Sequence, residues 1–335
     1  MKRVKFGTIG TSWITEAFIR GARHCEEFEL WAIYSRSEDK AKAFAEKNNA
    51  VKYYTDLNEM LSDKEIDAVY IASPNSLHAE QAIKAMNAGK HVICEKPVTS
   101  NAVEFKEMME TAKKNGVTLM EAFKSTLMPG FFKYKEILWK AGQIRSVFAD
   151  FGKYSSRYDA HKRGEDVNTF KAEFSNGALM DLGVYCLYPV IKLFGEPKDV
   201  KAFSAIVPGG VDGAGVTILD YEDFTATLKY SKVGNSYLPT EIQGEDATII
   251  IDRINQPRTV EIIYRNGEKE LFNCELMDDD MYYEAREFID CILNEKTESD
   301  INDHETSLTV MKVMDNARLQ SGVLYPADKK ILGEK

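Results

Sequence analysis

The chain has 335 residues, of which 44% are hydrophobic and 29% are charged, as is ordinary for a globular protein. This length favours two domains, each large enough to bury a hydrophobic core. The formal net charge is −10 and no long basic run occurs, which argues against a nucleic-acid partner.

No apolar stretch has the length and flanks of a signal peptide or a membrane span. We therefore expect a cytoplasmic protein with no membrane partner. The five cysteines and five histidines are scattered and form no Cys-x-x-Cys motif or mixed cluster. Their dispersal predicts reduced thiols and no metal site.

Strand and helix patterns alternate through the first third of the chain. Short apolar strands are expected over residues 4–9, 28–34, 51–54, 67–72, 91–94 and 117–120. Helices are expected between them over residues 14–22, 37–47, 76–87 and 103–115. Repeated β-α-β units of this kind predict a parallel, doubly wound sheet.

Beyond about residue 121 the pattern changes to one of alternating apolar and polar residues. Alternation of this kind covers residues 224–230, 248–252 and 260–264, and Asn266-Gly267 predicts a hairpin turn into 269–272. It predicts an antiparallel sheet with one covered face. Helices are expected over residues 178–194, 281–293 and 305–320, and the last of them could belong to either domain.

A glycine turn joins the first strand to the first helix. In Gly10-Thr11-Ser12-Trp13-Ile14-Thr15 only the first of the three glycines of the usual dinucleotide-binding pattern is present. Serine in place of the second glycine is small enough for the backbone to approach a pyrophosphate, which the following helix amino terminus would attract. The motif alone is weak, and a tight turn without a ligand is the alternative.

The end of the second strand carries Ser35-Arg36-Ser37 instead of the acidic residue that usually holds the ribose hydroxyls of NAD. Arginine and hydroxyl groups offer charge-assisted donors to a 2′-phosphate, so the sequence favours NADP over NAD. Glu38 and Asp39 lie close by and could still reach a ribose, and Arg36 could be an ordinary surface charge.

A polar loop, Ser73-Pro74-Asn75, leaves the strand over residues 67–72 and is expected to border the cofactor. Asn75 has an amide that can bridge ribose or carboxamide groups. His78, in the first turn of the next helix, is more typical of a structural hydrogen-bonding residue than of a catalyst.

The most informative motif is Glu95-Lys96-Pro97, at the carboxyl end of a buried apolar strand, where open α/β sheets bind ligands. Oxidation of a carbinol needs a proton acceptor and a positive field at the developing alkoxide, and Lys96 could serve either purpose. Glu95 could orient that lysine. A surface ion pair at a strand end is the alternative.

A second candidate lies on the helix over 178–194, where Asp181 and Tyr185 are four residues apart and share one face. A tyrosine near a lysine is a plausible proton-transfer pair, because the cation favours the phenolate. Asp181 could hold a substrate hydroxyl. Periodicity does not show whether this helix meets Lys96.

Together these segments resemble the Gfo/Idh/MocA family, which includes glucose–fructose oxidoreductase and inositol dehydrogenase. The matching pieces are Gly10-Thr11-Ser12-Trp13-Ile14, Ala72-Ser73-Pro74-Asn75-Ser76-Leu77-His78, Gly89-Lys90-His91-Val92 leading to Glu95-Lys96-Pro97, and Gly177-Ala178-Leu179-Met180-Asp181-Leu182-Gly183. The segment from Asp181 to Cys186 is similar to the dimeric dihydrodiol dehydrogenase and NADP-dependent D-xylose dehydrogenase branch, which has tyrosine where many members have histidine.

The resemblance implies a Rossmann domain over 1–121 and a domain over 122–302 built on a large open, mostly antiparallel sheet. It implies that a final helix over 303–322 packs back on the first domain, and that subunits associate through the open sheet as homodimers or homotetramers. It also implies NADP- or NAD-dependent hydride transfer to or from a sugar, cyclitol or vicinal diol.

By the same resemblance Lys96 and Asp181 are active-site residues, and Tyr185 is the general acid/base. The residues expected at the cofactor are Gly10, Ser12, Trp13, Ile14, Ser35, Arg36, Ser73, Pro74, Asn75, His78, Glu95 and Lys96. Those expected to line the substrate pocket are Phe123, Arg157, Tyr158, Asn168 and Phe170.

Two positions depart from the family's usual sequence, and one alternative function has to be considered. Relatives often have arginine and histidine where Thr126 and Met128 stand, which predicts a less polar substrate pocket. The alternative is a non-catalytic dinucleotide sensor on the same fold. Such a protein has no need of Lys96, Asp181 and Tyr185, and this chain has all three.

Overall fold

The computed structural model describes residues 3–329 and divides into two compact units. The first unit contains the chain up to Lys124 together with Met277–His304, and the second contains Ser125–Leu276 and the chain from Glu305 onward.

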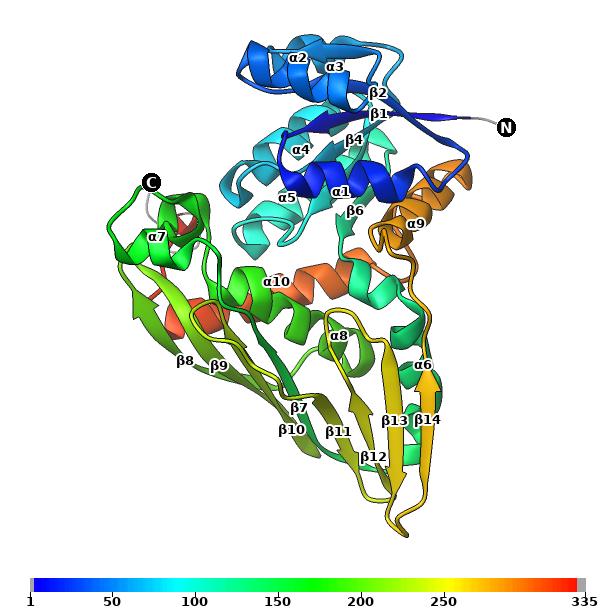
Figure 1. Cartoon of the computed structure of the whole chain (residues 1–335), viewed down its shortest axis with the longest axis vertical. Helices are drawn as coiled ribbons and strands as arrows, with labels where there is room; N and C mark the ends of the chain where they lie inside the picture. Colours follow the sequence, from blue (N-terminus) through cyan, green and yellow to red (C-terminus); the bar gives the residue numbers. More distant parts are fainter. Residues whose placement is uncertain (1–2, 330–335) are drawn as a thin grey trace. The chain divides into compact units, whose positions relative to one another are not determined.

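The first unit is built on a parallel six-stranded sheet with the order β3-β2-β1-β4-β5-β6 (Figure 1). The strands are β1 (Val4–Ile9), β2 (Phe28–Tyr34), β3 (Lys52–Tyr54), β4 (Ala68–Ile71), β5 (His91–Glu95) and β6 (Leu119–Ala122). This order confirms the predicted doubly wound sheet and creates a switch point between β1 and β4.

Five helices connect these strands, and a sixth comes from the C-terminal part of the chain. They are α1 (Trp13–Ala22), α2 (Glu38–Lys47), α3 (Leu57–Ser62), α4 (His78–Asn87), α5 (Ala102–Asn115) and α9 (Tyr282–Leu293). The short helix α3 was not predicted.

Helix α9, from the C-terminal part of the chain, belongs to the first unit, while the packing of residues 303–322 on that unit stays a prediction. Helices α1 and α9 lie side by side (Figure 1), and a Cβ on Gly21 would lie 2.5 Å from the backbone nitrogen of Tyr282. The later helix, α10 (His304–Gln320), belongs to the second unit from Glu305 onward. There Ser307 Oγ lies 2.9 Å from Tyr188 Oη, and Gln320 donates to the carbonyl of Val200 at 2.7 Å.

Aromatic side chains fill the core of the first unit. Phe6 lies 6.0 Å from Phe288 of α9 and 5.0 Å from Phe28, measured between ring centroids. Phe18 of α1 stacks on Tyr70 of β4 with centroids 3.8 Å apart. Because each buried phenylalanine contributes about 1.5–3 kcal/mol, these contacts explain why α1 and α9 are held on the sheet.

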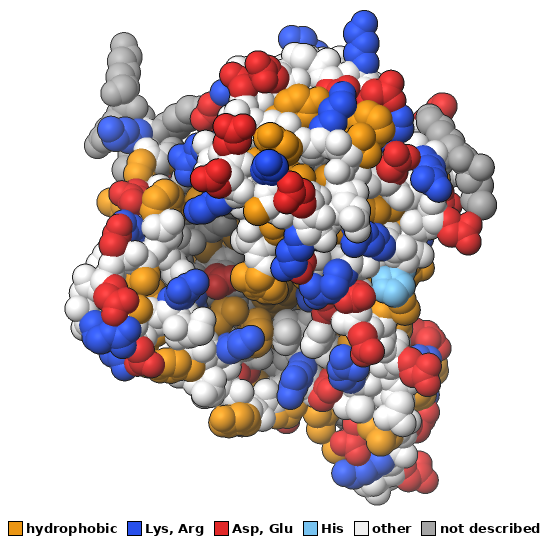
Figure 2. All heavy atoms as spheres, turned by 45° about the horizontal axis from the view of Figure 1, so that its top comes forward, with side chains coloured by type: hydrophobic (Ala, Val, Ile, Leu, Met, Phe, Trp, Pro, Cys, Tyr) orange, Lys and Arg blue, Asp and Glu red, His pale blue; other side chains and the backbone are white. Residues whose placement is uncertain are grey.

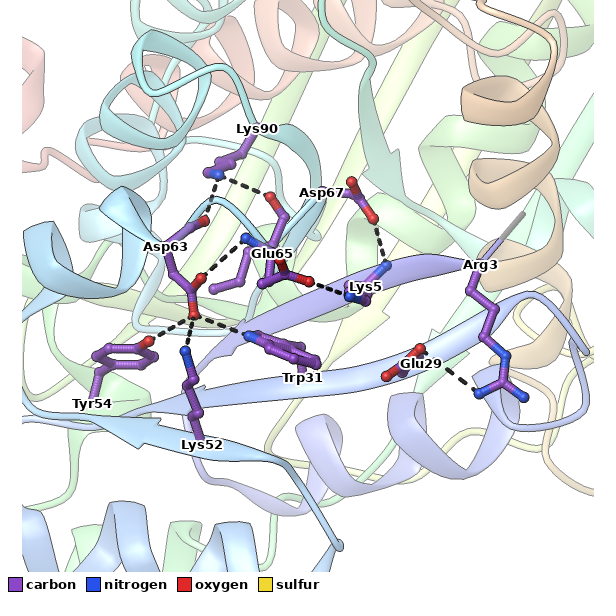
Figure 3. Close-up of polar contacts among 11 residues, drawn as sticks. Arg3, Lys5, Glu29, Trp31, Lys52, Tyr54, Asp63, Glu65, Asp67 and Lys90 are labelled. Atoms are coloured by element: carbon purple, nitrogen blue, oxygen red, sulfur yellow. Dashed lines mark hydrogen bonds and ion pairs between the residues drawn. The ribbon is translucent and has the colours of Figure 1, made fainter. Parts of the chain in front are cut away.

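A polar cluster around Asp63, just after α3, ties β2 to β3 (Figure 3). Its carboxylate accepts hydrogen bonds from Trp31 Nε1 at 3.0 Å, Tyr54 Oη at 2.7 Å and Lys52 Nζ at 3.0 Å. Burial by itself raises the pKa of Asp63, but these bonds, with one from the Glu65 amide, outweigh burial and hold the pKa below its usual range.

The second unit is built on an eight-stranded sheet with the order β14-β13-β12-β11-β7-β10-β9-β8 (Figure 1). The strands are β7 (Ile144–Gly152), β8 (Asp199–Val207), β9 (Val211–Tyr221), β10 (Phe224–Ser231), β11 (Thr240–Gly244), β12 (Ala247–Ile251), β13 (Thr259–Tyr264) and β14 (Lys269–Asn273). The predicted hairpin at Gly267 joins β13 to β14. Every neighbouring pair is antiparallel except β7 and β10, which are parallel.

Alternation along β10 separates the two faces of this sheet. Ala226, Leu228 and Tyr230 are buried, whereas Thr225 and Lys229 are exposed. Helix α8 (Val184–Phe194) packs on the buried face (Figure 1). This unit also contains α6 (Pro129–Ile137), α7 (Tyr158–Lys162) and, from Glu305 onward, α10. The sheet is therefore covered on one face, as predicted.

One apolar stretch, Ala172–Phe194, is long and apolar enough to pass a membrane-span test, but 72% of its most apolar window is buried inside the structure. This is the pattern of a core helix. On the face drawn in Figure 2, basic and acidic side chains are intermixed.

Candidate active site

The turn between β1 and α1 lies at the switch point of the first sheet. Gly10 has φ of +115°, and a Cβ there would lie 2.7 Å from the backbone oxygen of Ala72, so a larger residue does not fit. Ser12 precedes α1 in extended conformation with no side-chain capping bond, and the buried Thr15 Oγ1 has no hydrogen-bond partner among residues 3–329. Unpaired amides and an orphaned hydroxyl fit a phosphate group.

The segment after β2 carries side chains that can donate hydrogen bonds to a phosphate. The Arg36 side chain is exposed, and the Ser37 amide donates to Ser35 Oγ at 3.3 Å. Ser37 precedes α2 without a side-chain capping bond. A guanidinium beside two hydroxyls fits a phosphate monoester.

His78 fastens the loop after β4 to the chain after β5. Its Nε2 lies 2.9 Å from the Ser73 carbonyl and its Nδ1 lies 3.0 Å from the Pro97 carbonyl. Burial lowers the pKa of His78. These contacts agree with the structural interpretation of this histidine, and Pro74 and Asn75 follow Ser73 in a short 3₁₀ turn region, partly exposed.

Glu95 ends β5 as a buried carboxyl group. It accepts a hydrogen bond from Tyr70 Oη at 2.6 Å. Burial raises its pKa, although the Tyr70 bond and the charge of Lys96 act in the opposite direction. Lys96 follows as a partly exposed residue, and the Lys96–Pro97 peptide bond is cis.

A second buried carboxyl group, Glu284 on α9, lies in the same polar cluster and was missed by the sequence analysis. Burial, and then the charge of Glu95, raise the pKa of Glu284 well above its ordinary value. Its Oε1 has no hydrogen-bond partner among residues 3–329. Lys124 Nζ pairs with Asp280 Oδ2 at 2.6 Å beside it, and the Lys124 charge opposes the rise.

Asp181 lies in the π-helical turn Leu179–Gly183, and Tyr185 follows in the first turn of α8. Lys232 Nζ pairs with Asp181 Oδ2 at 2.8 Å, and the side chain of Lys232 is only 4% exposed. The ring of Tyr185 packs edge-on against Phe151 of β7, with centroids 5.5 Å apart. Both candidate residues are partly exposed.

Two of the expected pocket residues lie in the same cluster as Asp181. The buried Phe170 ring is 5.4 Å from the Tyr158 ring, and Lys232 Nζ is 5.3 Å from the Phe170 centroid. Arg157 and Asn168 are exposed in the same unit. Phe123 is fully buried in the first unit.

The candidate residues thus form one group in each unit. Glu95 and Lys96 belong to the first unit with the expected cofactor contacts, and Asp181 and Tyr185 belong to the second. Among residues 3–329, no group of three or more His, Cys, Asp or Glu side chains is arranged to hold a metal ion.

Comparison with known protein families identifies both units. The family model "Oxidoreductase family, NAD-binding Rossmann fold" of GFO/IDH/MocA matches residues 4–123, and the GFO/IDH/MocA C-terminal domain matches residues 139–250. The chain belongs to the GFO/IDH/MocA family. It is therefore an oxidoreductase whose first unit is a nicotinamide-dinucleotide-binding Rossmann fold, as the motifs predicted.

Two relatives within the GFO/IDH/MocA family illustrate its range. The chain is 51% identical to scyllo-inositol 2-dehydrogenase (NADP(+)) IolU of Bacillus subtilis, over 97% of this chain and 99% of the relative. It is 28% identical to trans-1,2-dihydrobenzene-1,2-diol dehydrogenase of Mus musculus, over 98% and 99%. The expected likeness to dihydrodiol dehydrogenases is confirmed, and the inositol dehydrogenase is the more similar of these two.

A solved structure of the family has the same fold. It is KijD10, a 3-ketoreductase from Actinomadura kijaniata in complex with NADP and TDP-benzene, which superposes with a TM-score of 0.83 at 24% identity. The superposition covers 97% of this chain and 99% of that one.

Proposed function

We propose that this protein transfers hydride between NADP(H) and a ring carbon of a cyclitol or related polyol, interconverting a secondary alcohol and a ketone. The observation that carries the proposal is the 51% identity to an NADP-dependent scyllo-inositol 2-dehydrogenase, which extends over 97% of the chain. A match of this extent spans both units.

The residues of the first unit fit the cofactor. We assign the pyrophosphate to the Gly10–Thr15 turn, because it combines unpaired amides with the orphaned Thr15 hydroxyl. We assign the 2′-phosphate to Ser35, Arg36 and Ser37, because a guanidinium and hydroxyls favour a phosphate there. The bound nicotinamide supplies or accepts the hydride.

Three side chains would manage the proton of the substrate hydroxyl. We assign the proton exchange to Tyr185 Oη, and we assign to Lys96 a positive field that favours the phenolate and the developing alkoxide. Asp181 would accept a hydrogen bond from a substrate hydroxyl and orient the ring. Tyr158, which is partly exposed and packs on the buried Phe170 ring, would supply an apolar wall.

The test is the appearance of reduced nicotinamide, followed by its absorbance. NADP⁺ and NAD⁺ would be offered with scyllo-inositol, myo-inositol, aldoses and vicinal diols. Turnover with a cyclitol and NADP⁺ supports the proposal. Binding of NADP⁺ without turnover of any polyol would favour a dinucleotide sensor instead.

We also propose a cytoplasmic homodimer or homotetramer that associates through the uncovered face of the second sheet. That face carries Phe203, which is 70% exposed, and a cavity of about 520 Å³ lined by Phe203, Val216 and Lys229 among others. A solvent-facing aromatic beside a hollow on an open sheet favours burial against a second copy. Phe203→Asp should lower the mass measured by light scattering. An unchanged mass would reject this face, and Trp139→Asp, at a comparably exposed tryptophan, is the control.

A further inference from the structure

Lys232 is a buried cation with an unusual position. It directly follows β10, and it continues the alternation of Ala226, Leu228 and Tyr230, which face the covered side of the sheet. Its side chain is only 4% exposed. A lysine in a series of buried apolar positions is costly unless its ammonium is paired, so its partner is informative.

The partner of Lys232 is the candidate substrate-orienting carboxylate. Lys232 Nζ lies 2.8 Å from Asp181 Oδ2, and the Asp181 side chain is 41% exposed. One side of this carboxylate is thus held by a buried cation while part of it stays accessible. The same ammonium lies 5.3 Å from the centroid of Phe170, within the range of a cation–π contact.

The backbone around Lys232 is fixed on both sides. The Lys232 amide donates to the Gly213 carbonyl at 2.8 Å, and its carbonyl accepts from the Ser155 amide at 2.8 Å. The ammonium therefore extends from an anchored main chain, so its position is well defined.

Asp212 is hydrogen-bonded to the same helical turn. It is 1% exposed, and its Oδ2 accepts a hydrogen bond from the Leu179 amide at 2.7 Å, at the start of the turn that carries Asp181. Burial raises the pKa of Asp212 to about 6, although the Leu179 bond and the charge of Lys232 oppose the rise. Lys232 is therefore within electrostatic reach of both carboxyl groups.

We propose that Lys232 is a positioning residue of the active site, which fixes the Asp181 carboxylate in the orientation that receives the substrate hydroxyl. The inference rests on the proposed function, because it takes Asp181 as the group that orients substrate. It adds a residue that acts through Asp181 and ties the catalytic helix to the end of β10. The alternative is that the pair only stabilises the fold.

The test is a double-mutant cycle on kcat with Lys232→Met, Asp181→Asn and the double variant. We expect Lys232→Met to lower kcat about 100-fold, the size of loss expected from misplacing a reacting group. In the Asp181→Asn background the same change should cost less than about 3-fold, because the two residues act as one unit. The KM for NADP⁺ should stay unchanged, and Lys232→Arg should recover most of the lost kcat because it keeps the cation.

The matched control is Lys133→Met. Lys133 of α6 lies in the same unit and is also paired with a carboxylate, Glu136, at 2.8 Å, but that carboxylate is 66% exposed. Lys133→Met should leave kcat unchanged. The proposal would be overturned if the double variant lost kcat by the product of the two single losses, which means additive activation free energies. An unchanged kcat in Lys232→Met would also overturn it. If Lys232→Met does not fold, Lys232→Gln takes its place in the cycle.

Failure of the proposed function is distinguishable from failure of this inference. If the wild-type protein turns over no polyol in the panel, the function fails, and the same cycle is then measured on the unfolding midpoint. Coupling between Lys232 and Asp181 in that cycle would support the inference that Lys232 fixes the Asp181 carboxylate. Additive shifts of the unfolding midpoint would overturn it.

Discussion

Tyr70 Oη donates a 2.6 Å hydrogen bond to Glu95 Oε1, and both residues are buried in the first unit. Tyr70 also stacks on Phe18 of α1, so this bond connects the aromatic core to the residue that precedes Lys96. A buried tyrosine–carboxyl bond immediately before the candidate catalytic lysine indicates that the strand end is rigidly held.

Removing this hydroxyl should weaken the first unit. Tyr70→Phe leaves the ring stack intact but removes a donor from a buried carboxyl group, which should cost about 1–3 kcal/mol of unfolding free energy. Urea denaturation measures the loss. Tyr134→Phe is the control, because burial is the cause of its raised pKa and no side-chain bond joins it to the described residues. Equal losses in the two variants would mean that the bond to Glu95 contributes little.

Glu284 should make stability fall as the pH rises. Its folded pKa is raised well above its ordinary value, while an unfolded glutamate titrates near about 4.3. Between these values the folded protein binds more protons than the unfolded chain, so unfolding free energy decreases from about pH 4.3 upward. Glu284→Gln should flatten this decline. Denaturation profiles from pH 5 to 8 test it, with the exposed Glu46→Gln as control; an unaltered slope in Glu284→Gln would contradict the assignment.

Asp63 should have the opposite pH dependence. Hydrogen bonds hold its folded pKa below the unfolded value of about 3.9. Its contribution is therefore complete above about pH 4 and is lost as the pH falls through the folded pKa. Asp63→Asn should lower stability at pH 7 by about 1–3 kcal/mol and reduce the acid-side slope, since asparagine has no charge and only one acceptor oxygen, whereas both carboxylate oxygens of Asp63 accept hydrogen bonds (Figure 3). Thermal unfolding at pH 3 and pH 7 measures both effects, and a difference from wild type that is the same at both pH values would argue against this assignment.

Arg36 should determine cofactor choice. Arg36→Ala should raise the KM for NADP⁺ by about 10- to 100-fold, the worth of a charged hydrogen bond, while the KM for NAD⁺ changes little. Initial rates with each cofactor measure the effect. An equal change in the KM values for NADP⁺ and NAD⁺ would show that Arg36 does not bind the 2′-phosphate.

Much of the first unit was predictable because its signals are local. Apolar strands, glycine stops and capping residues occur within a few positions of each element, and the predicted boundaries of strands such as Val4–Ile9 and Phe28–Tyr34 are confirmed. In the second unit β7, β8, β9 and β11 were not predicted. Strands there interrupt their alternation, as at the register shift between Ala205 and Ile206, and depend on partners far along the chain.

The site was only partly predictable for the same reason. Lys96, Asp181 and Tyr185 lie in recognisable motifs, whereas Glu284 enters the first unit from a helix almost 200 residues after Glu95. Lys232 did leave a signal, because it occupies the apolar phase of the β10 alternation. The membership of the two C-terminal helices was not predictable, because only tertiary contacts place α9 in the first unit and α10, from Glu305 onward, in the second.

The most direct test of the central claim is the initial rate of NADP⁺ reduction with scyllo-inositol, measured for the wild-type protein and for Lys96→Met, together with NADP⁺ binding by both. We predict turnover by the wild type, a loss of about 1,000-fold in Lys96→Met and similar cofactor binding, because general acid–base and field effects contribute about 100- to 10,000-fold. Equal turnover by the two proteins, or cofactor binding without turnover of any polyol by the wild type, would contradict the account.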